Sequence, residues 1–516
     1  MSQRSLRLFS ITLIFLGWTL YLRGIQRELP YEPFIDEPIF VERAIHMAAT
    51  GDPNPHWFGN PGSTTIYPLA AIYRFWFAAT EAGAWLSPDP RLSTAFAADS
   101  SIYYLVGRLL TIAYGLLTGA LTFALGKRAA GARVGLLAAL FLIFYPTLAW
   151  HTTVVRTDTS AMFFVALALW FCWKAADEPR LAHFVLAGGA MGLALSSRYL
   201  MVSIYFVYLV FFLLQLPQWR RNGRFSRAIW GFCIGGLVSA LIFALSSPFF
   251  FFDFETAWQN LLAEARSSHV GADGKNYLER LFWYLTSAIP ASIYNGQSFA
   301  LLLGVAWSFW QRQWRALALA GFVLVYVAII SIPALHWQRW TIQISPVLAL
   351  LAAFGVERMV TILTRWIDAR LNVAVTLFLG IALVAQPAYT TGKVVVKLRS
   401  TSTRIEARHW IEANVPPQSR IIGELYTAPL QNTPFVFVSQ PVLPERPLDF
   451  YLSGEFDFVM TSSEISNRFA ADPERYAAQL ELYAQLSELP LLQEFVPDAW
   501  QGGPSIRIFR LPKGEE

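Results

Sequence analysis

Two adjacent carboxylates, Asp36 and Glu37, follow the first apolar run that is long enough to cross a membrane. They open the stretch 34–68, FIDEPIFVERAIHMAATGDPNPHWFGNPGSTTIYP, which reads as a short amphipathic helix and then a loop. A carboxylate held at a helix start can stay ionised and act as a general base. The structural alternative is that Asp36 is a helix N-cap, with Pro38 in the first turn and Gly51 as the C-terminal stop. The two interpretations are compatible.

The loop 52–67 is dense in Pro, Gly, Asn and aromatic residues. A sugar site needs apolar faces that stack on the ring and polar groups that bind its hydroxyls, and this loop has both. The candidate sugar or acceptor residues are His56, Trp57, Asn60 and Tyr67. The alternative is an aromatic belt at the level of the lipid headgroups.

Further ionisable residues fall at the ends of other apolar runs, on the side predicted to carry the acidic pair: Arg108, Arg156, Asp158, Arg198, His336 and Arg339. Ionisable groups at membrane depth are costly and usually functional, and arginine binds phosphate bidentately. The cluster therefore predicts a site for an anionic lipid phosphate. The local alternatives are an Arg156–Asp158 ion pair, an N-cap by Asp158, and snorkelling of single cations.

The composition excludes a set of soluble domains. Of 516 residues, 55% are hydrophobic and only 15% are charged, and the mean hydropathy is +0.41. Apolar runs of about 18 residues or more recur, each long enough to cross the hydrocarbon core as a helix. The net charge of +5 comes from basic residues in short loops rather than from one basic face, so we expect no binding to nucleic acid.

We predict an α-helical polytopic membrane protein with about eleven transmembrane helices. The expected spans are 6–23, 102–125, 133–150, 158–174, 181–197, 199–216, 228–247, 286–310, 315–333, 341–357 and 372–389. The pair over 181–216 is either two spans or two re-entrant half-helices. The N-terminal run is expected to stay as an anchor, because no small-residue cleavage site follows it.

Short loops rich in Lys and Arg, such as 217–227, alternate with longer and less basic ones. The positive-inside rule puts the basic loops and the N-terminus in the cytoplasm. The first loop, 24–101, and the tail after 390 then lie outside. This orientation puts the acidic pair and the candidate phosphate-binding cations on one face of a cytoplasmic (inner) membrane.

The tail is more polar than the rest of the chain. Residues 1–390 form the expected transmembrane module, 391–400 a linker, and 401–516 a small extracytoplasmic α/β domain. Its predicted elements are helices over 401–414 and 474–489 and strands over 420–425, 434–439, 456–462 and 505–511.

The chain resembles the GT-C superfamily of polyprenyl-phosphate-dependent glycosyltransferases, in the bacterial branch similar to protein O-mannosyltransferases and lipid A aminoarabinose transferases. The residues that carry the resemblance are the acidic pair within FIDEPIFVERA, the run GRLLTIAYGLLTGALTFALGKRAAGARVGLLAALFLIFYP, the R-x-D of Arg156 and Asp158, GLALSSRYL, QRWTIQISPVLALLAAFGVER, and RIEARHWIEANVPPQSRI in the tail. The matching motifs span nearly the whole chain.

The resemblance implies transfer of a sugar from a polyprenyl-phosphate donor to a hydroxyl acceptor (protein, lipid or glycan) outside the cytoplasmic membrane. It implies that Asp36 is the catalytic base and that basic residues hold the lipid phosphate. The chain departs from the family pattern after the acidic pair, where Pro38 begins Pro-Ile-Phe, and at Arg198, where relatives often have Lys. The sugar is therefore left open.

We expect an inverting transfer in which Asp36 is the base and Glu37 orients the acceptor or tunes Asp36. No HExxH, CxxC or HxxxH motif occurs, and a divalent cation held by Asp36, Glu37 or Asp158 stays an alternative. A transporter or flippase of a lipid-linked saccharide is the main alternative function, although no internal repeat is visible. A membrane scaffold whose tail binds a partner is another.

Overall fold

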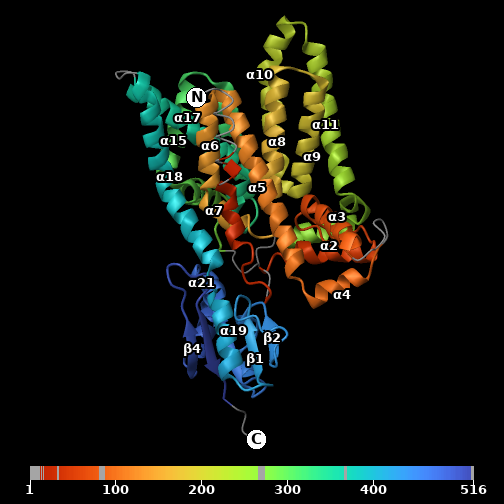
Figure 1. The fold of residues 1–516 in the computed structure, drawn as a ribbon, viewed down its shortest axis with the longest axis vertical. Helices are drawn as coiled ribbons and strands as arrows, with labels where there is room; N and C mark the ends of the chain where they lie inside the picture. Colours follow the sequence, from red (N-terminus) through yellow and green to blue (C-terminus); the bar gives the residue numbers. More distant parts are fainter. Residues whose placement is uncertain are drawn as a thin grey trace. The chain divides into compact units, whose positions relative to one another are not determined.

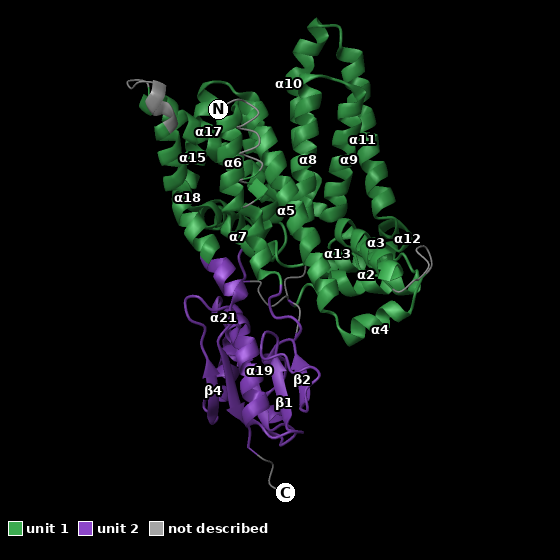
Figure 2. Cartoon of the chain, in the orientation of Figure 1, with its two compact units in different colours: residues 1–25, 35–266, 277–392 green, residues 26–34, 267–276, 393–516 purple. Residues whose placement is uncertain are grey.

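The structure is a computed structural model that describes residues 12, 14–15, 17–31, 34–80, 88–264, 273–364 and 369–512. The chain divides into two compact units (Figure 2). Unit 1 comprises Met1–Ile25, Ile35–Arg266 and Tyr277–Gly392, and unit 2 comprises Gln26–Phe34, Ser267–Asn276 and Lys393–Glu516.

Unit 1 is helical throughout its described part (Figure 1). Its amino-terminal elements are η1 (Tyr21–Gly24), α2 (Pro38–Thr50), α3 (Ser63–Thr80) and α4 (Arg91–Ala98). The elements that follow are α5 (Ser101–Ala130), α6 (Ala132–Ile143), α7 (Pro146–His151), α8 (Asp158–Asp177), α9 (Leu181–Ser197), η2 (Tyr199–Ser203), α10 (Ile204–Arg221), α11 (Phe225–Ser246), α12 (Phe249–Phe252), α13 (Phe254–Glu264), α14 (Tyr277–Trp283), η3 (Tyr284–Ala288), α15 (Ile289–Trp310), α16 (Trp314–Ile330), η4 (Gln338–Ile344), α17 (Ser345–Leu363) and α18 (Ala369–Arg399).

Six described stretches are long and apolar enough to cross a membrane: Ser101–Ala130, Asp158–Asp177, Tyr199–Arg221, Phe225–Ser246, Gln338–Leu363 and Ala374–Asn414. Three shorter apolar helices accompany them, Ala132–Ile143, Leu181–Ser197 and Trp314–Ile330. The protein is therefore a multi-pass membrane protein, and the total of eleven spans stays a prediction. Eight of the 18 residues of the first predicted span, 6–23, fall outside the described residues. The pair over 181–216 consists of two separate helices, α9 and α10.

The predicted span 133–150 is not one helix. α6 ends at Ile143, and α7 begins at Pro146 after an extended Tyr145. The proline has no N–H to donate and disfavours the helical conformation of the residue before it. The break allows the chain to turn before the loop that carries Arg156.

Glycine allows the closest helix pairs in unit 1. A Cβ at Gly188 on α9 would lie 2.1 Å from the carbonyl oxygen of Gly235 on α11. A Cβ at Gly355 on α17 would similarly lie 1.7 Å from the carbonyl oxygen of Ala300 on α15. Small residues let helix backbones approach closely enough to gain packing energy inside a membrane, where burial of apolar surface gives no advantage.

Unit 2 contains a five-stranded sheet in the order β2-β1-β3-β5-β4. The strands are β1 (Arg420–Glu424), β2 (Val436–Gln440), β3 (Phe458–Ser462), β4 (Leu491–Phe495) and β5 (Ile506–Arg510). β1 is parallel to β2 and β3, whereas β5 is antiparallel to both β3 and β4. The other elements are α19 (Thr403–Asn414), η6 (Leu443–Glu445), α20 (Leu448–Leu452), α21 (Ser463–Ala470) and α22 (Ala477–Ser487).

Alternation along the strands creates two cores, because successive side chains point to opposite faces of a sheet. Ile421 packs in one core with Ala407 and Ile411 of α19. Ile422 packs in the other with Leu482 and Leu486 of α22. Every strand predicted from the sequence is present, and β4 is an additional one.

Unit 2 also contains a segment from the start of the chain, residues 26–34. Glu28 accepts a hydrogen bond from Arg404 over 3.2 Å, and the Arg408 guanidinium lies 4.7 Å from the centre of the Tyr31 ring. The predicted linker 391–400 is mostly helical, because α18 continues to Arg399. Neither feature was predicted.

Candidate active site

Asp36 lies in the turn before α2 and binds two arginines that are distant in sequence. Its Oδ2 accepts hydrogen bonds from Nη2 of Arg156, on the loop before α8, and over 3.2 Å from Nη1 of Arg339 in η4. The Asp36 side chain is 31% exposed and that of Arg339 28%, whereas Arg156 is buried. A carboxylate that solvent can reach is thus held between two cations.

These cations determine the ionisation of Asp36. Burial by itself would raise the pKa of this carboxyl, but the charges and hydrogen bonds of Arg156 and Arg339 outweigh burial and lower the pKa below its ordinary value. Asp36 is therefore an anion at neutral pH. The N-cap interpretation is wrong, because the N-cap position is Glu37, whose side chain makes no capping bond. The predicted stop at Gly51 is confirmed, with φ of 81°.

Glu37 makes a separate ion pair inside unit 1. It accepts hydrogen bonds from Nε and Nη2 of Arg108 on α5, over 2.8 and 2.6 Å, and from the backbone N of Val155 over 2.9 Å. Nη1 of Arg108 donates to the carbonyl oxygen of Ile25. Glu37 is 0% exposed and Arg108 1%. A direct role for Glu37 on the acceptor, or for Arg108 on a lipid phosphate, would need an accessible side chain, and neither residue has one.

Asp158 and Arg198 form another buried pair. Nη1 of Arg198 donates to Oδ1 of Asp158, which also accepts from Nε2 of Gln343 over 2.7 Å. Neither local alternative for Asp158 is observed: Arg156 pairs with Asp36 and Arg198 with Asp158 instead of Arg156 with Asp158, and the N-cap of α8 is Thr157. Since Gln343 and Arg339 both lie in η4, the Asp158 pair fixes the element that carries one of the Asp36 partners.

Two histidines are close in sequence to the arginines that bind Asp36, His336 to Arg339 and His151 to Arg156. The ring of His336 packs edge-on against Trp283, with centroids 4.5 Å apart. Nδ1 of His151, the last residue of α7, lies 3.0 Å from Nη1 of Arg156. Arginine can only donate, so Nδ1 of His151 is the acceptor and the proton of the neutral ring is on Nε2. The sequence interpretation did not single out His151, although it lies in the same short segment as Arg156.

The predicted loop 52–67 is a loop only in its first part, because α3 begins at Ser63 and Tyr67 therefore lies on that helix. His56 Nε2 is 2.8 Å from Oδ2 of Asp52, and the Tyr67 hydroxyl donates to the carbonyl oxygen of Pro53 over 3.1 Å. Trp57 packs against Phe40 and Arg43. Asn60 is half-buried. Within the described residues, no hydrogen bond or ion pair joins His56, Trp57, Asn60 or Tyr67 to Asp36. These four residues therefore make no direct polar contact with the carboxylate in the described part of the chain.

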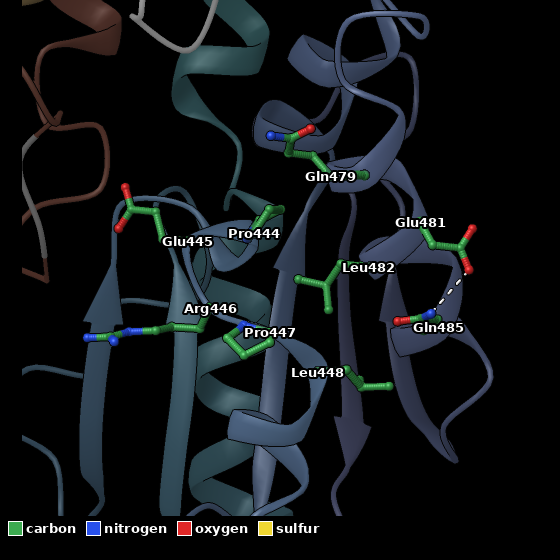
Figure 3. Close-up of a pocket in the computed structure, with 10 residues that line it drawn as sticks. Pro444, Glu445, Arg446, Pro447, Leu448, Gln479, Glu481, Leu482 and Gln485 are labelled. Atoms are coloured by element: carbon green, nitrogen blue, oxygen red, sulfur yellow. Dashed lines mark hydrogen bonds between the residues drawn. The ribbon is translucent and has the colours of Figure 1, made fainter.

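A surface hollow of about 340 Å³ lies in unit 2 (Figure 3). Pro444, Arg446, Leu448, Gln479, Leu482 and Gln485 line it, and Gln485 donates to Glu481 over 3.1 Å. It contains no residue of the predicted site. No group of three or more His, Cys, Asp and Glu that could hold a metal ion occurs in the part of the chain that the structure describes.

Residues 92–250 match the family model described as dolichyl-phosphate-mannose-protein mannosyltransferase. The match includes Arg108, Arg156, Asp158 and Arg198 but not Asp36 or Glu37. A search of curated proteins found no match.

Solved structures give a longer match. ArnT from Cupriavidus metallidurans, bound to undecaprenyl phosphate, is 14% identical, with 98% of each chain covered and a TM-score of 0.53. The oligosaccharyltransferase AglB from Archaeoglobus fulgidus, in complex with an inhibitory peptide and a dolichol-phosphate, is 13% identical. Its match covers 96% of this chain and 74% of that one, with a TM-score of 0.50.

These matches offer no support for the transporter alternative. They confirm the resemblance inferred from the sequence: the chain has the fold of GT-C membrane glycosyltransferases, and part of it matches a mannosyltransferase family model.

Proposed function

We propose that this protein is an inverting glycosyltransferase that moves a sugar from a polyprenyl-phosphate donor to a hydroxyl acceptor, with Asp36 as the base. The observation that carries the proposal is the position of Asp36, a partly exposed carboxylate held by Arg156 and Arg339. The presence of undecaprenyl phosphate and dolichol-phosphate in the structures of ArnT and AglB supports the class of donor.

In the proposed reaction, the partly exposed Arg339 turns from Asp36 to the lipid phosphate when the donor binds, while the buried Arg156 keeps its pair with Asp36. Because arginine binds phosphate through paired N–H groups, the Arg339 guanidinium stabilises the charge that develops on the leaving group, and Arg156 adds its positive charge from its buried position. His336, three residues before Arg339, assists. Arg198 acts from its buried pair with Asp158 by fixing η4, rather than by touching the phosphate.

The release of Arg339 also activates the base. Asp36 then loses one of the two charges that lower its pKa, and its carboxylate becomes a stronger proton acceptor. The acceptor oxygen attacks the anomeric carbon, the bond from that carbon to the phosphate oxygen breaks, and the acceptor proton passes to Asp36. The electron pair of the broken bond leaves with the polyprenyl phosphate, so donor binding and base activation are coupled.

The remaining assignments follow the predicted topology. We place the protein in the cytoplasmic membrane with a cytoplasmic N-terminus, an extracytoplasmic loop 24–101 and an extracytoplasmic domain over 401–516. The loop with His56, Trp57, Asn60 and Tyr67 is proposed to meet the sugar or acceptor once substrates are bound.

The test is Asp36→Asn, with Asp99→Asn as the matched control. Asp99 is another acidic residue of the first loop, is exposed, and accepts a hydrogen bond from the backbone N of Ser101. Loss of a positioned base lowers the rate by ~10²–10⁴-fold, so D36N membranes should release polyprenyl phosphate from labelled donor that much more slowly than D99N membranes. A folded D36N protein that transfers at the wild-type rate would refute the assignment. Mass spectrometry of glycoconjugates from a deletion strain identifies sugar and acceptor.

A further inference from the structure

α11 has an exposed apolar stripe. Trp230, Leu237, Leu241 and Leu245 recur at intervals of seven and four residues, which puts them on one helix face, and all are exposed. Phe225–Ser246 is among the helices long and apolar enough to cross a membrane. A membrane helix presents such a stripe to lipid.

The apolar surface continues beyond the end of α11. Phe251 and Phe252 in α12 are exposed, the latter to 81%. Phe254, Trp258 and Leu262 then follow at four-residue spacing along α13 and are all exposed. Aromatic residues, which predominate in this segment, are enriched at the boundary between lipid and water.

The faces of α13 have different surroundings. Ala257 is fully buried and marks the packed face. Glu255 and Gln259 are exposed on the polar side, where Gln259 donates to Glu255 over 3.4 Å. The exposed apolar residues of α13, Phe254, Trp258 and Leu262, lie between these two faces. A helix with separate packed, apolar and water-facing sides is suited to lie flat in the membrane interface.

The packed side of this segment holds the first loop. Asn260 on α13 accepts a hydrogen bond from the backbone N of Phe58 over 2.9 Å. Asp253, between α12 and α13, accepts from Nδ2 of Asn54 over 3.0 Å. Figure 2 shows α12 and α13 in the same region of unit 1 as α2 and α3. The position of α13 relative to the membrane surface therefore also sets the position of the first loop.

We infer that α12 and α13 form a membrane-surface anchor, in which Phe251, Phe252, Phe254, Trp258 and Leu262 insert into the boundary between headgroups and acyl chains. The ligand is the lipid surface itself, and the anchor fixes residues 54–58 relative to it. The segment 249–264 has three acidic residues and no Lys or Arg. Insertion therefore depends on burying the apolar face to a depth of about 5–10 Å in the membrane interface, and not on anionic lipid.

The experiment uses the full chain in phosphatidylcholine nanodiscs, with Cys172 and Cys233 replaced. Leu262→Cys carries an environment-sensitive fluorophore, and Gln259→Cys is the matched control on the polar face of the same helix. We expect lipids with a nitroxide near the headgroup to quench the label at 262 several-fold more strongly than the label at 259. Aqueous iodide should show the reverse order. Adding anionic lipid should leave the pattern unchanged.

Equal quenching of both labels by iodide would overturn the proposal. So would protection of position 262 from both quenchers together with disulfide formation between two copies of the unlabelled Leu262→Cys protein, since a second protein chain would then cover the stripe. Hydrogen exchange gives a measurement that does not depend on the labels. Phe254→Ser/Trp258→Ser should speed exchange at residues 54–58, whereas Glu255→Ser should not.

Discussion

Asp36 and Glu37 are consecutive residues with different environments. The first is reached by solvent between two cations, and the second is enclosed with Arg108. Sequence reasoning found the pair because acidic residues next to a membrane span are rare. It could not divide their roles, since the partners of Asp36 lie 120 and 303 positions away and that of Glu37 71 positions away. Local patterns report neighbours within a few residues only.

Glu37→Gln should destabilise the protein rather than disable its chemistry. Removing one partner of a buried ion pair leaves an uncompensated charge and costs about 3–5 kcal/mol. Replacing both partners, as in Glu37→Leu/Arg108→Leu, should regain much of that loss, because no buried charge remains. Thermal unfolding in detergent measures both variants. A stably folded E37Q protein without transferase activity would instead assign Glu37 a role at the substrate.

Most helices of unit 1 were predictable from the length of their apolar runs. The sequence missed the short helices between α11 and α15, because the gap 248–285 was interpreted as a connecting loop. It also missed β4, whose pairing with β5 has an irregularity between Leu491 and Gln493. Such a bulge interrupts the alternation on which a strand prediction depends.

The close packing of α9 against α11 can be tested by substitution, with control positions on the same two helices. Gly188→Ala should separate α9 from α11 and lower the free energy of unfolding by about 1–3 kcal/mol, as overpacking does. Gly189→Ala and Gly236→Ala should be neutral to slightly stabilising, because a Cβ at either position meets no atom within 4 Å. Unfolding midpoints of the three variants in one detergent give the comparison. Equal midpoints would show that α9 and α11 do not pack closely.

The stability of the molecule depends on pH through a buried carboxyl group in unit 2. Glu424 at the end of β1 is buried and accepts from the backbone N of Leu443 and Ser462 and from the hydroxyl of Tyr483. Burial raises its pKa to about 7, from an ordinary value of 4.5. The folded state therefore keeps a proton that the unfolded chain releases at lower pH.

The direction in which pH changes the stability follows from this difference between the pKa of Glu424 in the folded and unfolded states. The stabilisation by the bound proton is complete below pH 4.5 and is lost as the pH rises to about 7, at a cost of up to about 3 kcal/mol. Glu424→Gln, which imitates the protonated side chain, should remove this pH dependence. Hydrogen exchange at β1 and β3 in the full chain, corrected for intrinsic rates, measures it between pH 5 and pH 7.5. The same slope in both proteins would contradict the assignment.

The membership of residues 26–34 in unit 2 has a consequence for biosynthesis. Glu28 and Tyr31 precede their partners Arg404 and His409 by 376 and 378 positions. At ~5–20 residues per second, the ribosome needs roughly 20–75 s to make that interval. The segment just before the acidic pair therefore enters the membrane environment long before its partners exist. Chains that terminate early would carry Asp36 but lack the ordered segment that leads to it.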